Sequence, residues 1–167
     1  GAYQVRKDGE SRDTGIFYDP EGVSADELDT LRRHADADAL RLLTLEQFVD
    51  EVVFGIGWRL RAAIVGFNLP FDLSRLAVRH GLARSREDGG GQDMRGGFTF
   101  TLSHQKIYPN VLVKHVSRRM AFIRFAGTMG ATDSRSARKH KDFGPIRRGH
   151  FIDVKTLAGA LFGQDFS

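Results

Sequence analysis

The sequence predicts an α/β fold, in which strands buried on both faces alternate with helices. Two stretches carry this prediction, because each joins a short apolar run to a segment with apolar residues at helical spacing. The first stretch is Ala63–Ala77 and the second is His150–Phe162. Each has an Asp close to the end of its strand. In open α/β sheets, functional groups gather at this carboxyl end of the strands.

Composition is that of an ordinary soluble globular protein and excludes two kinds of site. The chain has 167 residues, enough for one domain with a sizeable core, and its 41% hydrophobic and 28% charged residues are typical values. It contains no Cys, which excludes disulfides and thiolate metal ligands and fits a cytoplasmic protein. No apolar run is long enough to span a bilayer, so we expect no membrane partner.

The first part of the chain is predicted to hold a hairpin and two capped helices. Strands at 1–6 and 15–18 flank a polar stretch, so we expect a hairpin with a long loop. Capping boxes at Ser24–Glu27 and Thr44–Gln47 each predict a helix start, because a hydroxyl and a side-chain oxygen bond reciprocally to backbone N–H groups. In the second helix, apolar residues recur at helical spacing: Leu45, Phe48, Val49, Val52 and Val53.

The segment after the strand at Ala63–Phe67 carries two polar residues of interest, Asn68 and Asp72. Asn68-Leu-Pro70 ends the strand, and Pro70 suits the first helical position because its missing N–H would be unpaired there. Apolar residues then recur at helical spacing, and Gly81 is the expected C-terminal cap. Asp72 falls in the first helical turn, where a carboxylate also favours the positive end of the helix dipole.

The region between this helix and the last strand is predicted to be rich in strands. Residues 84–97 are Gly-rich and charged, which predicts a surface loop. Strands are expected at 98–102, 111–116 and 120–126, the last two as a hairpin. In the first of them apolar and polar residues alternate, as in a strand with one buried face. We therefore expect one domain over residues 1–167, with a β-rich insertion at about 84–149.

The last strand is predicted to end at Asp153, and a helix should follow it up to Gly163. Asp153 can be interpreted as a helix cap or as a metal ligand. Capping is the commoner role for an Asp at this position.

The heptapeptide Gly66-Phe-Asn-Leu-Pro-Phe-Asp72 resembles the second exonuclease motif of the DEDD 3′–5′ exonucleases. In that motif an Asn, an aromatic residue and an invariant Asp follow one another at the end of a core strand. The family includes the proofreading domains of DNA polymerases and belongs to the ribonuclease H-like superfamily. The resemblance covers residues 63–77. It implies a ribonuclease H-like mixed sheet flanked by helices.

The same resemblance implies a metal-dependent 3′–5′ exonuclease that acts on DNA or RNA. Two ions about 4 Å apart would serve such a reaction, and hard oxygen ligands select Mg²⁺ or Mn²⁺. Asp72 would be the catalytic metal ligand. Asn68 would bond to the terminal nucleotide and Phe71 would pack against it. The alternatives are a turn-forming Asn, a core Phe and a carboxylate at a helix start.

The family's other acidic motifs are missing from this sequence. An Asp-x-Glu strand should precede the strand of Tyr3, and a Tyr- or His-x-x-x-Asp helix should follow the last helix. We expect both to lie outside this piece, in further parts of the same chain. Two alternatives stay open, namely a nucleic-acid-binding module that has lost its metals and a structural domain of a larger assembly.

Basic residues cluster between Arg135 and Arg148, on a chain with a formal net charge of +4. A local basic cluster favours a polyanionic partner, here single-stranded or 3′-ended nucleic acid. The residues expected to meet phosphates are Lys139, Lys141, Arg147 and Arg148. The alternative is a solvated loop.

Overall fold

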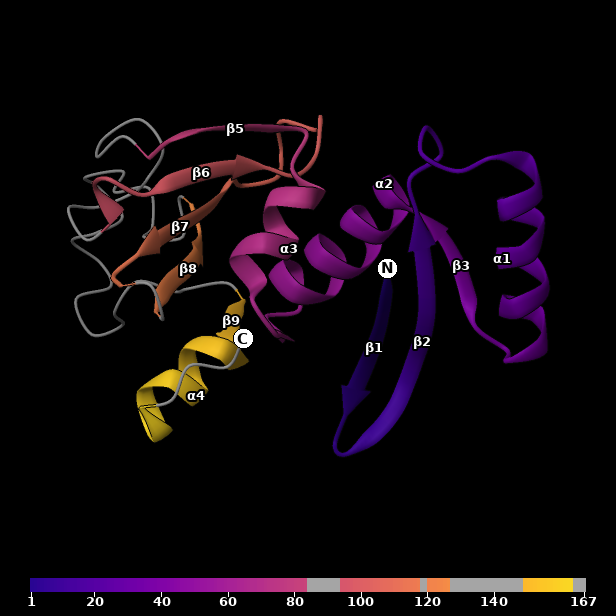
Figure 1. The fold of residues 1–167 in the computed structure, drawn as a ribbon, viewed down its shortest axis with the longest axis horizontal. Coiled ribbons are helices and arrows are strands. Elements are labelled where there is room, and N and C mark those ends of the chain that lie inside the picture. The colour runs from indigo at the N-terminus through magenta and orange to yellow at the C-terminus, as the bar shows by residue number, and fades with distance from the viewer. Residues whose placement is uncertain (84–93, 118–119, 127–148, 164–167) are drawn as a thin grey trace, which may run out of the picture. The chain divides into compact units, whose positions relative to one another are not determined.

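A computed structural model of the chain describes residues 1–83, 94–117, 120–126 and 149–163 (Figure 1). Helices and strands are mixed and the strands form several sheets, which agrees with the predicted α/β class. The backbone divides into two compact units, residues 1–52 and 53–167. In the described part of the chain, none of the helices is long and apolar enough to cross a membrane.

The first unit contains a three-stranded sheet. One helix precedes its third strand in the sequence and another follows it. Its elements are β1 (Ala2–Lys7), β2 (Glu10–Tyr18), α1 (Ala25–Ala37), β3 (Arg41–Thr44) and α2 (Leu45–Gln47). The strand order is β1-β2-β3, with β1 antiparallel and β3 parallel to β2. The parallel pairing of β2 and β3 requires a crossover, which α1 provides. Figure 1 shows α1 beside β3.

The turn between β1 and β2 is shorter than predicted. Only Asp8 and Gly9 separate the two strands, and their φ angles are +55° and +83°. Positive φ at both central residues is what a two-residue hairpin turn needs, and Asp-Gly is among the sequences that adopt it most readily. The predicted long loop is therefore wrong, because these two residues reverse the chain and the polar residues around them join the strands.

Both predicted capping boxes are present. The Ser24 hydroxyl accepts a hydrogen bond from the Glu27 N–H, and the Glu27 carboxylate accepts one from the Ser24 N–H. Thr44 and Gln47 bond in the same way. After α2 the chain continues as a π-helix, η1 (Phe48–Arg59), a winding that apolar spacing alone does not distinguish from an α-helix.

The core of the first unit forms around the ring of Phe48. This ring stacks on Phe17, with centroids 3.9 Å apart and planes 6° apart, and the ring of Tyr3 lies 5.4 Å away. The neighbouring Val49 is only 1% exposed. The predicted apolar face of this helix is thus confirmed in its first turns, where it covers β1 and β2.

Of the residues that the structure describes, those of the second unit form two sheets and two further helices. Its elements after η1 are β4 (Ala63–Gly66), α3 (Leu69–Leu76), β5 (Arg79–Leu82), β6 (Phe98–Thr101), β7 (Val111–His115), β8 (Ala121–Phe125), β9 (His150–Asp153) and α4 (Val154–Phe162). β4 and β9 pair in parallel, and β5-β6-β7-β8 form an antiparallel sheet in that order. The predicted strands at 98–102, 111–116 and 120–126 are confirmed within a residue or two, and the last two form the expected hairpin.

Helix α3 ends earlier than predicted. Ala77 already has extended backbone, and Gly81 lies within β5 and does not cap the helix. The N–H of Val78 donates to the carbonyl of Thr101, so the chain after the helix pairs with β6. This pairing satisfies backbone groups that a longer helix would otherwise have bonded. Pro70 occupies the second helical position, where its missing N–H is equally unneeded.

Burial along β6 also differs from the prediction. Thr99 is only 7% exposed, whereas Phe98 is 43% exposed. Thr99 lies opposite Leu112, which is fully buried, so this face of the sheet packs against core. The face that carries Phe98 is partly open. Phe100, on the predicted face, is buried as expected at 8% exposed, so β6 is covered on both faces and is open only at Phe98.

Gly149 offers a test of packing in the second unit. Its φ is +73°, and a Cβ built there would lie 2.4 Å from the carbonyl oxygen of Gly57. We expect Gly149→Ala to lower the free energy of unfolding by about 3 kcal/mol, because strain and a backbone clash combine. Gly163→Ala is the matched control: its φ is +64°, a Cβ built there has no atom within 4 Å, and only the strain of about 1 kcal/mol should appear. Urea unfolding measures both, and equal losses would contradict the clash.

A candidate site at the carboxyl ends of β4 and β9

The two strand–Asp–helix junctions predicted from the sequence lie side by side. Because β4 and β9 are parallel, both strands end at one edge, and their register places Gly66 opposite Asp153. Helices α3 and α4 begin at this edge. The N–H of Leu69, in the first turn of α3, donates to Oδ1 of Asp153 over 2.9 Å. One carboxylate therefore joins the start of the first helix to the end of the second strand.

Asp153 is the N-cap of α4, so the capping interpretation is confirmed. Its Oδ2 accepts hydrogen bonds from the backbone N–H of Thr156 at 3.0 Å and from the Thr156 hydroxyl at 2.6 Å. The Thr156 oxygen in turn accepts from the N–H of Ala121 in β8, at 3.1 Å. The Asp153 side chain is buried and both of its oxygens have donors, which leaves it little capacity for another ligand.

Asp72 is different, because its carboxylate is exposed at this edge. No hydrogen bond to it is found among the described residues. A Cβ built on Gly66 would lie 3.9 Å from Oδ2 of Asp72 and 2.6 Å from Cδ2 of Leu69. The first turn of α3 can therefore pack this close to β4 only because residue 66 has no side chain. Partial removal from water raises the pKa of Asp72, and the negative charge of Asp153 raises it further. Asp72 is a carboxylate available to a ligand.

Asn68 is held in an unusual backbone conformation just before α3. Its φ of 63° and ψ of 43° are left-handed, which Asn tolerates better than most residues. Its carbonyl accepts from the N–H of Phe71 at 2.9 Å, but its side chain makes no capping hydrogen bond. The Asn68 amide is therefore not used to start the helix, and it lines the hollow beside it.

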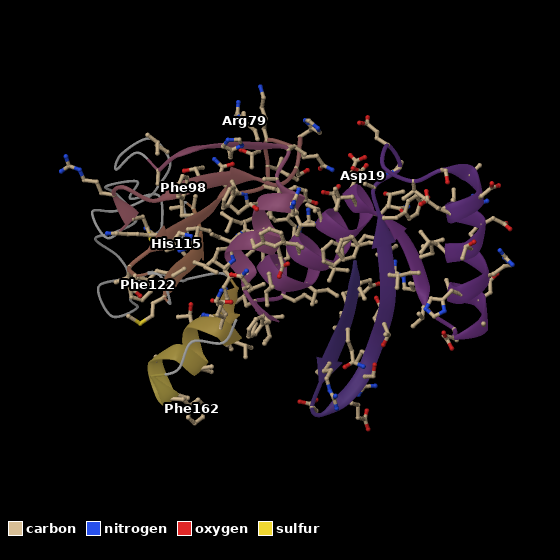
Figure 2. The ribbon with its side chains drawn as sticks, viewed as in Figure 1. Asp19, Arg79, Phe98, His115, Phe122 and Phe162 are labelled. Carbon is tan, nitrogen blue, oxygen red and sulfur yellow. The ribbon has the colours of Figure 1, made fainter. Side chains whose placement is uncertain are left out.

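An open hollow of about 490 Å³ lies between α3 and the β5–β8 sheet. Helix α3 and the turn before it contribute Asn68, Pro70, Phe71 and Ser74; the sheet contributes His80, Phe98, Phe100, Val113 and His115. Figure 2 labels Phe98 and His115 on the sheet. Phe71 is 53% exposed, so it is not the core residue of the alternative interpretation. The guanidinium of Arg75 stands over its ring at 5.2 Å.

The structure brings together three of the residues singled out in the sequence: Asn68, Phe71 and Asp72. The four basic residues Lys139, Lys141, Arg147 and Arg148 lie outside the described residues. Sequence reasoning missed the aromatic wall on β6 and the role of Thr156. Alternation of Phe98 and Phe100 did indicate a common face, but nothing local indicated that α3 would lie beside it.

The residues at this edge do not by themselves compose a metal centre. Within the described ranges, no group of three or more His, Asp or Glu side chains is arranged to hold an ion. Asp72 supplies one available carboxylate, and the oxygens of Asp153 are already engaged. Mg²⁺ is bound through one or two carboxylates together with water and substrate phosphates, so Asp72 fits as one ligand of a larger set.

The charge of Asp153 should be detectable in the titration of Asp72. In Asp153→Asn the neighbouring charge is gone, so the pKa of Asp72 should fall towards its ordinary value. Burial is unchanged, so part of the elevation should persist. Carboxyl ¹³C chemical shifts followed against pH measure the change. Glu27, whose pKa is lowered by its bonds to Ser24, is the internal control and should not move. An unchanged Asp72 titration would contradict the coupling.

Comparisons with known protein families, with curated proteins and with solved structures find no match to this chain. The function of the chain is therefore inferred from the site itself and from the resemblance of its heptapeptide.

Proposed function

We propose that this chain forms part of a metal-dependent 3′–5′ exonuclease of the DEDD type, acting on DNA or RNA. The observation that carries the proposal is the available carboxylate of Asp72, which lies beside Asn68 and Phe71 at the carboxyl edge of two parallel strands. The order of Asn, aromatic residue and Asp in this setting resembles the second exonuclease motif. A ribonuclease H-like arrangement of the complete sheet is part of this proposal.

Each of the three residues has a role suited to its position. Asp72 would be a ligand of Mg²⁺ or Mn²⁺, which would supply an activated water and neutralise charge on the phosphate. Asn68 presents an amide that can both donate and accept a hydrogen bond, as recognition of a nucleotide requires. Phe71 presents an exposed ring on which a sugar or base can pack.

The remaining ligands would come from outside the described residues. Asp153 would act on the site indirectly, because it holds the first turn of α3 through the N–H of Leu69. That bond would hold the helical turn in which Asp72 lies. In this role Asp153 is a positioning residue.

A second function, binding of nucleic acid without hydrolysis, has one observation in its favour. Asp72 is the single available carboxylate at this edge among the described residues, and one carboxylate is too few for a two-metal reaction. Such a module would keep the nucleotide contacts of Asn68 and Phe71 and would lack the chemistry.

A degradation assay beside a binding titration separates the two functions. The full-length protein is incubated with a 5′-labelled single strand and Mg²⁺ or Mn²⁺, and the products are resolved on a gel. A ladder that shortens from the 3′ end is the result expected of the exonuclease. A protein that binds the strand and never shortens it would be the binding module, and the enzymatic proposal would be abandoned.

A further inference from the structure

The face of the β5–β8 sheet that lines the hollow is buried at Phe100 and Val113 and exposed at Phe98, so an aromatic ring lies at its open margin. Strand pairing puts Phe98 opposite Val113 and His80 opposite Phe100, so these side chains share one face. The rings of Phe98 and Phe100 lie 6.5 Å apart between centroids, with planes 14° apart. Phe100 is buried and supports Phe98, whose ring is 43% exposed at the wall of the hollow.

Helix α3 provides the facing wall with a similar chemistry. Phe71 exposes its ring there, and Arg75 places its guanidinium over that ring at 5.2 Å. The Ser74 hydroxyl donates to the carbonyl of Phe71 at 2.6 Å, which holds this turn of the helix. Asn68 adds an amide that the helix cap does not use.

Charge and size limit what the hollow can hold. Of the described residues that line it, none is acidic and two are His, and the cation of Arg75 stands at its aromatic wall. A volume of about 490 Å³ lies within the range of small-ligand sites. Flat rings, an amide and a nearby guanidinium are complementary to a nucleobase with its phosphate, because every base can stack on an aromatic side chain.

We propose that this hollow binds unpaired bases of single-stranded nucleic acid, which stack on Phe98 and Phe71 next to the Asp72 edge. This inference rests on the proposed exonuclease function for the location of the 3′ end, but the binding does not need catalysis. It assigns the β5–β8 sheet the task of selecting single strands. Bases of a duplex are already paired and stacked, so they would not enter.

Binding is measured by fluorescence anisotropy of a 5′-labelled oligothymidine on the full-length protein, with EDTA present to prevent degradation. Phe98→Ala should weaken binding by roughly tenfold, as loss of one stacked base does elsewhere. Phe98→Trp should retain affinity. Phe122→Ala is the matched control: Phe122 is 65% exposed on β8 of the same sheet, opposite Lys114 and hence on the other face (Figure 2). Thermal unfolding of each variant shows that the fold is kept.

Three further ligands make the test specific for unpaired bases of a strand. An abasic strand with the same phosphates should bind weakly, and Phe98→Ala should not weaken it further. A duplex should likewise be insensitive to Phe98→Ala. Free thymidine monophosphate should compete poorly with the strand, and equal competition would overturn the assignment to a strand. Equal losses for Phe98→Ala and Phe122→Ala, or no loss for either, would overturn the site.

The outcomes also separate this inference from the proposed function. If the protein never shortens a strand but Phe98→Ala removes base-dependent binding, the base-binding site is supported and the exonuclease function is rejected. If strands are shortened and base-dependent binding is insensitive to Phe98→Ala, the exonuclease function is supported and the base-binding site is rejected.

Discussion

Asp72→Ala should abolish shortening of a 3′-ended strand and leave most of the affinity for that strand intact. A metal ligand acts on the charge that develops in the transition state, whereas affinity comes from contacts that the ground state already makes. We expect the rate to fall by at least about a hundredfold, the loss seen when one group that stabilises transition-state charge is removed. The same gel assay and anisotropy titration measure both quantities.

Two variants make this prediction specific. Asn68→Ala should slow degradation less than Asp72→Ala, because Asn68 positions the nucleotide and holds no metal. Asp26→Ala is the control, because Asp26 is also an acidic residue in a first helical turn, that of α1, and serves only the helix dipole. It should leave the rate unchanged. Degradation by Asp72→Ala at the wild-type rate would show that the active site is placed wrongly, whatever the protein's function.

Stability should respond to Asp72 in the opposite direction from activity. The raised pKa of Asp72 means that the folded state binds the proton more tightly than the unfolded state does. The protonated Asp72 side chain therefore makes its full contribution to the free energy of unfolding below the pKa of the unfolded state. This contribution is lost as the pH rises through the pKa of the folded state. At neutral pH the charged carboxylate is mildly unfavourable, so Asp72→Asn should unfold no more easily than the wild type. Any advantage of the variant should vanish in acid.

Much of the fold could be predicted from local sequence, because its signals lie within a few residues of one another. The capping boxes, the strand before Asn68 and the cap at Asp153 belong to this class. The short hairpin at Asp8-Gly9 could also have been predicted, since Asp-Gly is a strong turn sequence. The strand β3 could not be predicted, because it has only four residues, the last of which opens a capping box, and its pairing with β2 is not local.

In the candidate site too, local features could be predicted from the sequence and long-range contacts could not. Asn68, Phe71 and Asp72 lie within five residues of sequence, so a motif can reveal them. The bond from Leu69 to Asp153 spans 84 positions and that from Ala121 to Thr156 spans 35, and no spacing rule reaches so far. The facing of α3 and β6 across the hollow is likewise a consequence of tertiary packing.

These long-range bonds predict a large loss of stability in Asp153→Ala, comparable to that expected for Gly149→Ala. The substitution removes the acceptor of three hydrogen bonds, from the Leu69 N–H and from the N–H and hydroxyl of Thr156. Leu69 is 6% exposed, so its N–H would be left without a partner in a buried place. Loss of a cap costs about 1 kcal/mol, and a buried unpaired donor adds about 1–3 kcal/mol. We therefore expect a total of about 3 kcal/mol in urea unfolding.

Ser24→Ala separates the long-range part of this loss from ordinary capping. Ser24 caps α1 through bonds to Glu27 only, three residues away and exposed, so its removal should cost about 1 kcal/mol. Asp153→Asn should fall between the two, because an amide oxygen can still accept from Leu69 while the charge is lost. If Asp153→Ala costs no more than Ser24→Ala, then Asp153 does not hold the first turn of α3. A larger loss, with an altered amide signal for Leu69, would show that the cap of α4 also holds the first turn of α3.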